Sequence, residues 1–185
     1  MAALRIEGFV IVSADGRLAN ARNVMPDELK IEGDKRFFTA ALDRADLVVH
    51  GRHSGEEQPN APQRRRLILT RHVAATAPDP SNPKALLWNP AGCPFEAACR
   101  EAGVTSGMAA IIGGPGVFGM FMDRYDTFWL SIAPKVRIPD GRPCFPGVPA
   151  RTPQQVLSAH GLVAGEAQLI DKDHDVSVTP WRRVS

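Results

Sequence analysis

Two short clusters of basic and hydroxyl side chains suit the binding of a phosphate group. Arg52, His53 and Ser54 directly follow the apolar run DLVVHG (46–51), and Arg71 and His72 follow RLILT (66–70). A guanidinium group donates two parallel hydrogen bonds, which match the oxygens of a phosphate monoester. Either cluster alone could be a set of solvated loop charges. Two of them at one edge of a sheet would favour a ligand that carries several phosphates.

A glycine-rich turn interrupts the apolar stretch AAIIGGPGVFGMFM (109–122). Glycines after a strand allow close backbone approach, and the free N–H groups that begin a helix attract anions. The turn is not a GxGxxG fingerprint, and it lacks the lysine of a Walker A loop. By itself it is consistent with a phosphate-binding turn or with a tight turn between a strand and a helix.

The candidates for acid chemistry are Asp15, Glu32 and Asp34. Asp15 precedes a glycine, where its side chain could bond its own backbone or act in catalysis. Asp34 stands where a helix is expected to begin, so it could cap that helix or bind an amidine-like ring edge. Ser131, near the end of the expected strand DTFWLSI (126–132), could line the same pocket.

Several classes of function receive no support. The net charge is only +2, and the Arg64–Arg66 run has no aromatic platform beside it, so we expect no nucleic-acid binding. The histidines lack metal-ligand spacing, and no serine lies in a nucleophile motif, so we expect neither a metal site nor covalent hydrolysis. No apolar stretch could cross a membrane, and the start has no signal-peptide pattern. The three cysteines suit reduced packing residues, and we expect a cytoplasmic protein.

Strand and helix patterns alternate along the chain and predict an α/β fold. Apolar, β-branched runs predict strands at 4–13, 46–51, 66–70, 85–88, 108–112 and 126–132, with an antiparallel pair at 166–171 and 176–184. Helical spacing predicts helices at 33–45, 94–102 and 115–122. Prolines predict a surface loop at 76–84 and a long irregular connection at 133–153. We expect one domain over residues 1–185, with a mostly parallel sheet, helices on both faces, and ligands beyond the carboxyl ends of the strands.

In order along the chain, these loops resemble the dihydrofolate reductase-like superfamily, which includes the reductase domain of riboflavin biosynthesis. The resemblance rests on VSADGRLA (12–19), NVMP (23–26), VVHGRHS (48–54), LILTR (67–71), IIGGPGVF (111–118), LSIAP (130–134) and DGRPCFP (140–146). It implies a three-layer α/β/α fold and an NADPH-dependent oxidoreductase that transfers hydride without a metal or flavin. ADGRLA and SIAPKV look closer to the riboflavin-type reductases, whereas DELKIEG (27–33) departs from dihydrofolate reductases.

The resemblance also implies roles for individual residues. Asp34, or else Asp15, would orient the substrate or relay a proton, and Ser131 would line the substrate pocket. NADPH would lie along Leu18, Ala19, Arg52, His53, Ser54, Leu69, Thr70, Arg71, Gly113, Gly114, Gly116, Val117 and Phe118. The implied substrate is a pyrimidine of the 5-amino-6-ribosylaminouracil phosphate type, and the implied assembly is a homodimer. The alternatives are a dihydrofolate reductase acting on 7,8-dihydrofolate and a non-catalytic nucleotide-binding domain.

Overall fold

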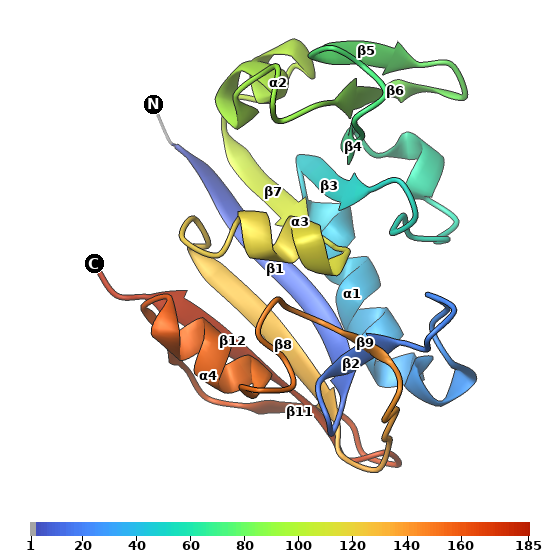
Figure 1. Cartoon of the computed structure of the whole chain (residues 1–185), viewed down its shortest axis with the longest axis vertical. Coiled ribbons are helices and arrows are strands. Elements are labelled where there is room, and N and C mark those ends of the chain that lie inside the picture. The colour runs from blue at the N-terminus through green and yellow to red at the C-terminus, as the bar shows by residue number, and fades with distance from the viewer. Residues whose placement is uncertain (1–2) are drawn as a thin grey trace.

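A single large sheet organises the protein, whose computed structural model describes residues 3–185 (Figure 1). Its strands run β10-β12-β8-β1-β7-β3-β4-β6-β5, and β11 pairs with β12 beside β10. The strands are β1 (Leu4–Ser13), β3 (Leu47–Gly51), β4 (Arg66–Leu69), β5 (Thr76–Asp79), β6 (Asn82–Trp88), β7 (Gly107–Ile111), β8 (Thr127–Ala133), β10 (Leu162–Ala164), β11 (Gln168–Asp171) and β12 (Val176–Arg183). A separate two-stranded sheet joins β2 (Arg17–Ala19) to β9 (Arg142–Pro143).

The central strands are parallel and the outer ones antiparallel. β8, β1, β7, β3, β4 and β6 pair in parallel, while β12 and β5 run antiparallel at the two sides. The predicted mixed sheet with an antiparallel C-terminal hairpin is therefore confirmed. All six parallel strands end on the same edge, so the loops that follow them gather there.

Helices cover both faces of the sheet. On β3, Val48 packs toward α1 (Glu32–Arg44), whereas Leu47 and Val49 pack toward α2 (Phe95–Glu101), α3 (Pro115–Met120) and α4 (Pro153–Ala159). In Figure 1, α3 and α4 lie in front of the strands. Successive side chains of a strand point to opposite faces, so an uninterrupted apolar strand needs cover on both. The three-layer arrangement follows from that pattern.

Two segments differ from the sequence-based prediction. Residues 76–84 do not form the expected surface loop, because they contribute β5 and the start of β6. Pro78 is tolerated because β5 is the outermost strand, where a missing N–H breaks no inner ladder. The connection at 133–153 contains β9, and α4 begins at its end, where Thr152 and Gln155 form a capping box. Short 3-10 turns lie at Asp27–Leu29 and Ala61–Gln63.

Over residues 3–185, no helix is long and apolar enough to cross a membrane. Within that same range, histidine, cysteine and acidic side chains nowhere gather in a group of three that could hold a metal ion.

Candidate functional site

The loop that carries Arg52 is joined directly to the glycine turn. Gly51, the last residue of β3, donates its N–H to the carbonyl oxygen of Gly113 across 2.7 Å. Gly113 has φ +115°, a conformation that favours glycine, and its peptide bond to Gly114 is cis. A Cβ added at Gly114 would lie 3.0 Å from the Ser54 hydroxyl oxygen. Two loops that the sequence separates by about sixty positions thus form one surface at the sheet edge.

A cavity of about 400 Å³ opens beside this surface, over the ends of β3, β4 and β6. Arg52, Thr70 and His72 line it together with Ile68, Asp79 and Leu87. Its polar side chains bring a guanidinium, a hydroxyl and an imidazole around one space, which suits a phosphate group. The carboxylate of Asp79 already accepts hydrogen bonds from the Ser81 N–H (2.9 Å) and hydroxyl (2.8 Å). Arg71 is exposed and is not among the lining residues.

The residues of the glycine turn differ in what they can offer a ligand. A Cβ at Gly116 would meet nothing within 4 Å, so the backbone there is open to close approach. Phe118 is 1% exposed and packs edge-on against Phe128 and Phe145. Val117 is also buried in this core. Contact with a ligand at this turn would therefore come from Gly113, Gly114 and Gly116, while the Phe118 ring supports the turn from beneath.

Asp34 does not cap its helix. α1 begins at Glu32 with Ile31 as a cap that makes no side-chain hydrogen bond, so Asp34 is the third helical residue. The N-cap interpretation of Asp34 is therefore wrong, and its carboxyl group is left available. Burial raises the pKa of Asp34 to about 6, and the nearby Ser131 hydroxyl opposes that rise. A carboxyl group with this pKa exchanges its proton near neutral pH.

Ser131 reaches Asp34 from the middle of the sheet. It is 2% exposed and pairs in β8 with Ile11 of β1 on one side and Val178 of β12 on the other. Ser131 shares its face of β8 with Trp129, whose ring packs against Phe37 of α1. This aromatic pair accounts for the apolar surroundings of the first turns of α1. Asp34 and Ser131 thus lie close together, and their role as substrate-pocket residues stays a prediction.

A carboxylate from the C-terminal hairpin caps the N-terminus of α1. Asp171 of β11 accepts a hydrogen bond from the Gly33 N–H at 3.0 Å, and the backbone N–H and Nδ1 of His174 contact its other oxygen at 3.1 and 2.9 Å. A hydrogen bond with His174 and another with the Gly33 amide lower the pKa of Asp171. A Cβ on Gly33 would lie 2.1 Å from the carbonyl oxygen of Ile170, so only glycine allows this contact. Sequence reasoning missed this residue, since the hairpin lies about 140 positions away.

The carboxylate of Asp15 is engaged in hydrogen bonds to neighbouring residues. Its carboxylate accepts a hydrogen bond from the Ser13 hydroxyl at 2.6 Å and others from the Ile138 N–H at 3.1 and 3.2 Å. Burial raises its pKa, but the hydrogen bonds from Ser13 and Ile138 outweigh this and leave the pKa below its usual value. An ionised carboxylate with these partners holds the loop after β1 in place and is a poor proton donor. On the same loop, Ala19 is 3% exposed and Leu18 is partly buried against the core.

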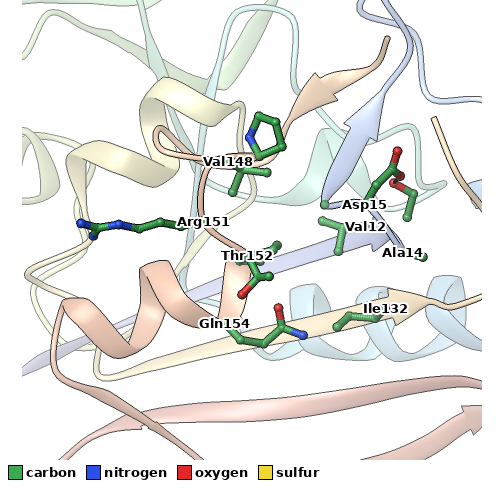
Figure 2. Close-up of a pocket in the computed structure, with 12 residues that line it drawn as sticks. Val12, Ala14, Asp15, Ile132, Val148, Arg151, Thr152 and Gln154 are labelled. Carbon is green, nitrogen blue, oxygen red and sulfur yellow. Dashed lines mark hydrogen bonds between the residues drawn. The ribbon is translucent and has the colours of Figure 1, made fainter. Parts of the chain in front are cut away.

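A second cavity, of about 260 Å³, lies where that loop faces the start of α4 (Figure 2). Val12, Asp15 and Ile132 form one side. Val148, Arg151 and Thr152 come from the segment leading into α4, and Gln154 from its first turn. Val12 and Ile132 belong to the face of the sheet opposite Ser131. This space is therefore distinct from the surroundings of Asp34.

The three consecutive arginines, Arg64 to Arg66, each bind a specific partner within the protein. Arg64 and Arg66 are buried and both bind the carboxylate of Glu56, at 2.9 Å each. Arg65 donates to the carbonyl oxygens of Ala102 and Gly103. The sequence alone is consistent with solvated charges at a strand entrance, which holds for the exposed Arg65 but is wrong for Arg64 and Arg66. Their partner Glu56 is eight positions from Arg64, and only the fold buries it between them.

Several solved structures are similar to this protein over almost its whole length. One is a riboflavin biosynthesis protein from Shewanella sp. PV-4. The match covers 98% of this chain and 100% of that one, with a TM-score of 0.69 and 18% identity. Dihydrofolate reductase from Enterococcus faecalis, complexed with NADP(H) and RAB-propyl, matches 98% and 97%, with a TM-score of 0.66 and 16% identity. The chain has a dihydrofolate reductase-like fold.

A third solved structure with this dihydrofolate reductase-like fold is a longer protein. It is the Thermotoga maritima diaminohydroxyphosphoribosylaminopyrimidine deaminase/5-amino-6-(5-phosphoribosylamino)uracil reductase, with a TM-score of 0.64 and 15% identity. The match covers 98% of this chain and 57% of that protein. No family model matches the sequence. No curated protein matches it either.

Proposed function

We propose that this protein is an NADPH-dependent reductase that transfers hydride to a pyrimidine-type heterocyclic substrate, of the 5-amino-6-ribosylaminouracil phosphate kind. The observation that carries the proposal is the place of Asp34 in a dihydrofolate reductase-like fold: it is the third residue of α1, near Ser131 of β8, with its pKa raised to about 6. Ser131 lies in the carboxyl-terminal half of β8, toward the edge of the sheet where the loops with Arg52, Thr70 and Gly113 also lie. A proton-exchanging carboxyl group and a dinucleotide surface at one edge are the two parts that such a reductase needs.

The donor set at the sheet edge fits NADPH. Arg52, Thr70 and His72 would hold the phosphate that distinguishes NADPH from NADH, with Leu69, Arg71, His53 and Ser54 nearby on the same loops. Gly113, Gly114 and Gly116 would let the pyrophosphate backbone pass close. Leu18 and Ala19 would lie over the nicotinamide. When bound, NADPH supplies the hydride.

The protein's own part in the reaction is orientation and proton supply. In its ionised form, Asp34 accepts two hydrogen bonds from the amidine-like N–C–N edge of a pyrimidine ring, while Ser131 holds the carboxylate in place. In its protonated form, Asp34 is an acid matched to neutral pH. Asp15 is the weaker candidate because the Ser13 hydroxyl and the Ile138 N–H already bind its carboxylate.

One observation favours dihydrofolate reductase as a second candidate. That group places a carboxylate in the first turn of the helix after its Met-Pro segment, and Asp34 is the third residue of α1, after Met25-Pro26. The extra residues between Pro26 and α1 form the short 3-10 turn Asp27–Leu29. A pteridine presents the same amidine-like edge as an aminopyrimidine, so Asp34 would serve either substrate.

The test is a spectrophotometric assay of NADPH oxidation with two substrates side by side, a 5-amino-6-ribosylaminouracil phosphate and 7,8-dihydrofolate. The proposal expects turnover of the uracil compound. Turnover of dihydrofolate alone would favour the second candidate. Tight NADPH binding without oxidation by either compound, or by a wider panel of pyrimidines and pteridines, would instead favour a non-catalytic nucleotide-binding domain. A homodimer, a single domain over 1–185 and a cytoplasmic location stay predictions from the sequence.

A further inference from the structure

A buried ion-pair group closes the loop that carries Arg52. Glu56, whose side chain is 3% exposed, accepts hydrogen bonds from Arg64 Nη1 at 2.9 Å and from Arg66 Nη1 and Nη2 at 2.9 and 3.0 Å. Arg64 also binds Asp43 of α1 at 2.6 Å, and Arg66 donates to the carbonyl oxygen of Ala61 at 2.8 Å. The far end of the loop is thus tied to β4 and to α1.

His50 connects this group to the near end of the loop. Its Nε2 lies 3.0 Å from Arg66 Nη1, and its Nδ1 lies 2.7 Å from the carbonyl oxygen of Gly51. A guanidinium can only donate and a carbonyl oxygen can only accept. The imidazole must therefore be neutral, with its proton on Nδ1. Burial is the main cause that lowers the pKa of His50, and the positive charge of Arg66 lowers it further, which agrees with the neutral form.

The chain of hydrogen bonds continues to the glycine turn. The carbonyl oxygen of Gly51 also accepts from the Ser54 N–H at 3.1 Å, and the Gly51 N–H donates to Gly113 at 2.7 Å. A continuous path therefore runs from Glu56 through Arg66, His50 and Gly51 to Gly113. Gly55 closes over the imidazole, since a Cβ there would come within 3.3 Å of His50 Cε1.

We propose that His50 is a positioning residue, which as the neutral Nδ1–H tautomer fixes the Arg52–Gly55 loop against the glycine turn and so pre-orders the cofactor-phosphate surface. The inference rests on the proposed NADPH site. Arg52 and His53 are exposed, whereas His50 and Arg66 beneath them are buried. A loop held at both ends loses less conformational entropy when a ligand binds, so holding it in place increases the affinity for that ligand.

The test compares two replacements of His50 by calorimetric titration with NADPH. His50→Leu keeps apolar volume but removes both hydrogen bonds, and it is expected to weaken NADPH binding about tenfold, since two buried bonds of modest net strength are lost. His50→Asn retains a donor that can reach the Gly51 carbonyl oxygen and is expected to stay within about threefold of the unaltered protein. His160→Leu is the control, because that exposed histidine binds Asp123 far from the loop. It should not change the affinity.

A second readout needs no cofactor and no variant. Nitrogen NMR of the His50 ring in the unaltered protein should find Nδ1 protonated and Nε2 unprotonated at neutral pH. A charged ring or the Nε2–H tautomer would overturn the inference, even where His50→Leu fails to fold. Equal NADPH affinity of His50→Leu and the unaltered protein would overturn the inference alone. Failure of the unaltered protein to bind NADPH at all would overturn the proposed function and this inference together.

Discussion

Asp171 of β11 accepts a hydrogen bond from the backbone N–H of Gly33, the residue that precedes Asp34 in α1, across 3.0 Å. The C-terminal hairpin therefore sets the first turn of the helix that carries the proposed acid. Because Ile31 provides no side-chain cap, this contact replaces a local one. An acidic group at this end of a helix is also favoured by the helix dipole.

Replacing Asp171 by alanine should affect both stability and turnover. Loss of a helix-capping carboxylate lowers the free energy of unfolding, and the freed first turn should misplace Asp34. We expect a lower melting temperature and a several-fold lower kcat with NADPH affinity retained. Asp173→Ala, an exposed position in the same turn, is the control and should change neither. Unaltered kcat in a destabilised Asp171→Ala protein would mean that the hairpin does not position Asp34.

The cavity beside β4 predicts which basic residues select NADPH over NADH. Arg52→Ala should weaken NADPH binding about tenfold to a hundredfold, because a guanidinium–phosphate interaction is lost, and should leave NADH binding nearly unchanged. Arg71→Ala should have a smaller effect than His72→Ala, since His72 lines the cavity and Arg71 does not. The measurement is the ratio of the two dissociation constants for each variant. Equal loss of NADPH and NADH affinity in Arg52→Ala would contradict this assignment.

Glu56 is expected to be important for stability. It is the shared partner of two buried arginines, so Glu56→Gln leaves Arg66 without a carboxylate partner, while Arg64 keeps Asp43. Removing one partner of a buried ion pair costs about 3–5 kcal/mol. Urea unfolding should detect a loss of this size, while Glu57→Gln, on the exposed side of the same loop, should lie within about 0.5 kcal/mol of the unaltered protein. Equal stability of the two variants would mean that solvent compensates the arginines.

The raised pKa of Asp34 also has a consequence for stability. The folded protein holds this proton up to a pKa of about 6, whereas the ordinary pKa of an aspartate in an unfolded chain is 3.8. Between those values the folded state binds more protons, so this group makes stability fall as pH rises through that window. Asp34→Asn removes the cost and should stabilise the protein at pH 7 by up to about 2 kcal/mol, a figure reduced for partial solvent contact. The gain should disappear below about pH 4; a pH-independent gain would point to another cause.

The fold could be predicted from local patterns because the central strands are short, apolar and separated by turns. The run DLVVHG needed cover on both faces, and α1 on one side with α2 and α3 on the other provide it. The segment 76–84 was misjudged, since a proline count does not reveal that β5 would be an edge strand. α4 carried a readable signal in TPQQ (152–155), whose threonine and glutamine form the capping box.

The site was less predictable, because its decisive contacts join distant parts of the chain. Arg52, Thr70 and Gly113 could be placed at one edge from the order of strands alone. The partnership of Asp34 with Ser131 and the capping by Asp171 depend on how the hairpin packs on α1. Sequence reasoning had no means to choose His72 over Arg71, as that choice depends on which way each side chain points after β4.

The most direct test of the central claim is the turnover of Asp34→Asn with saturating NADPH and a 5-amino-6-ribosylaminouracil phosphate. Loss of a positioned acid and of its carboxylate should lower kcat by about a hundredfold or more, with NADPH affinity retained. The unaltered enzyme should show a pH dependence with an apparent pKa of about 6 that the variant lacks. Turnover by Asp34→Asn at the unaltered rate, with the same pH profile, would contradict the assignment of Asp34 as the group that orients the substrate and exchanges its proton.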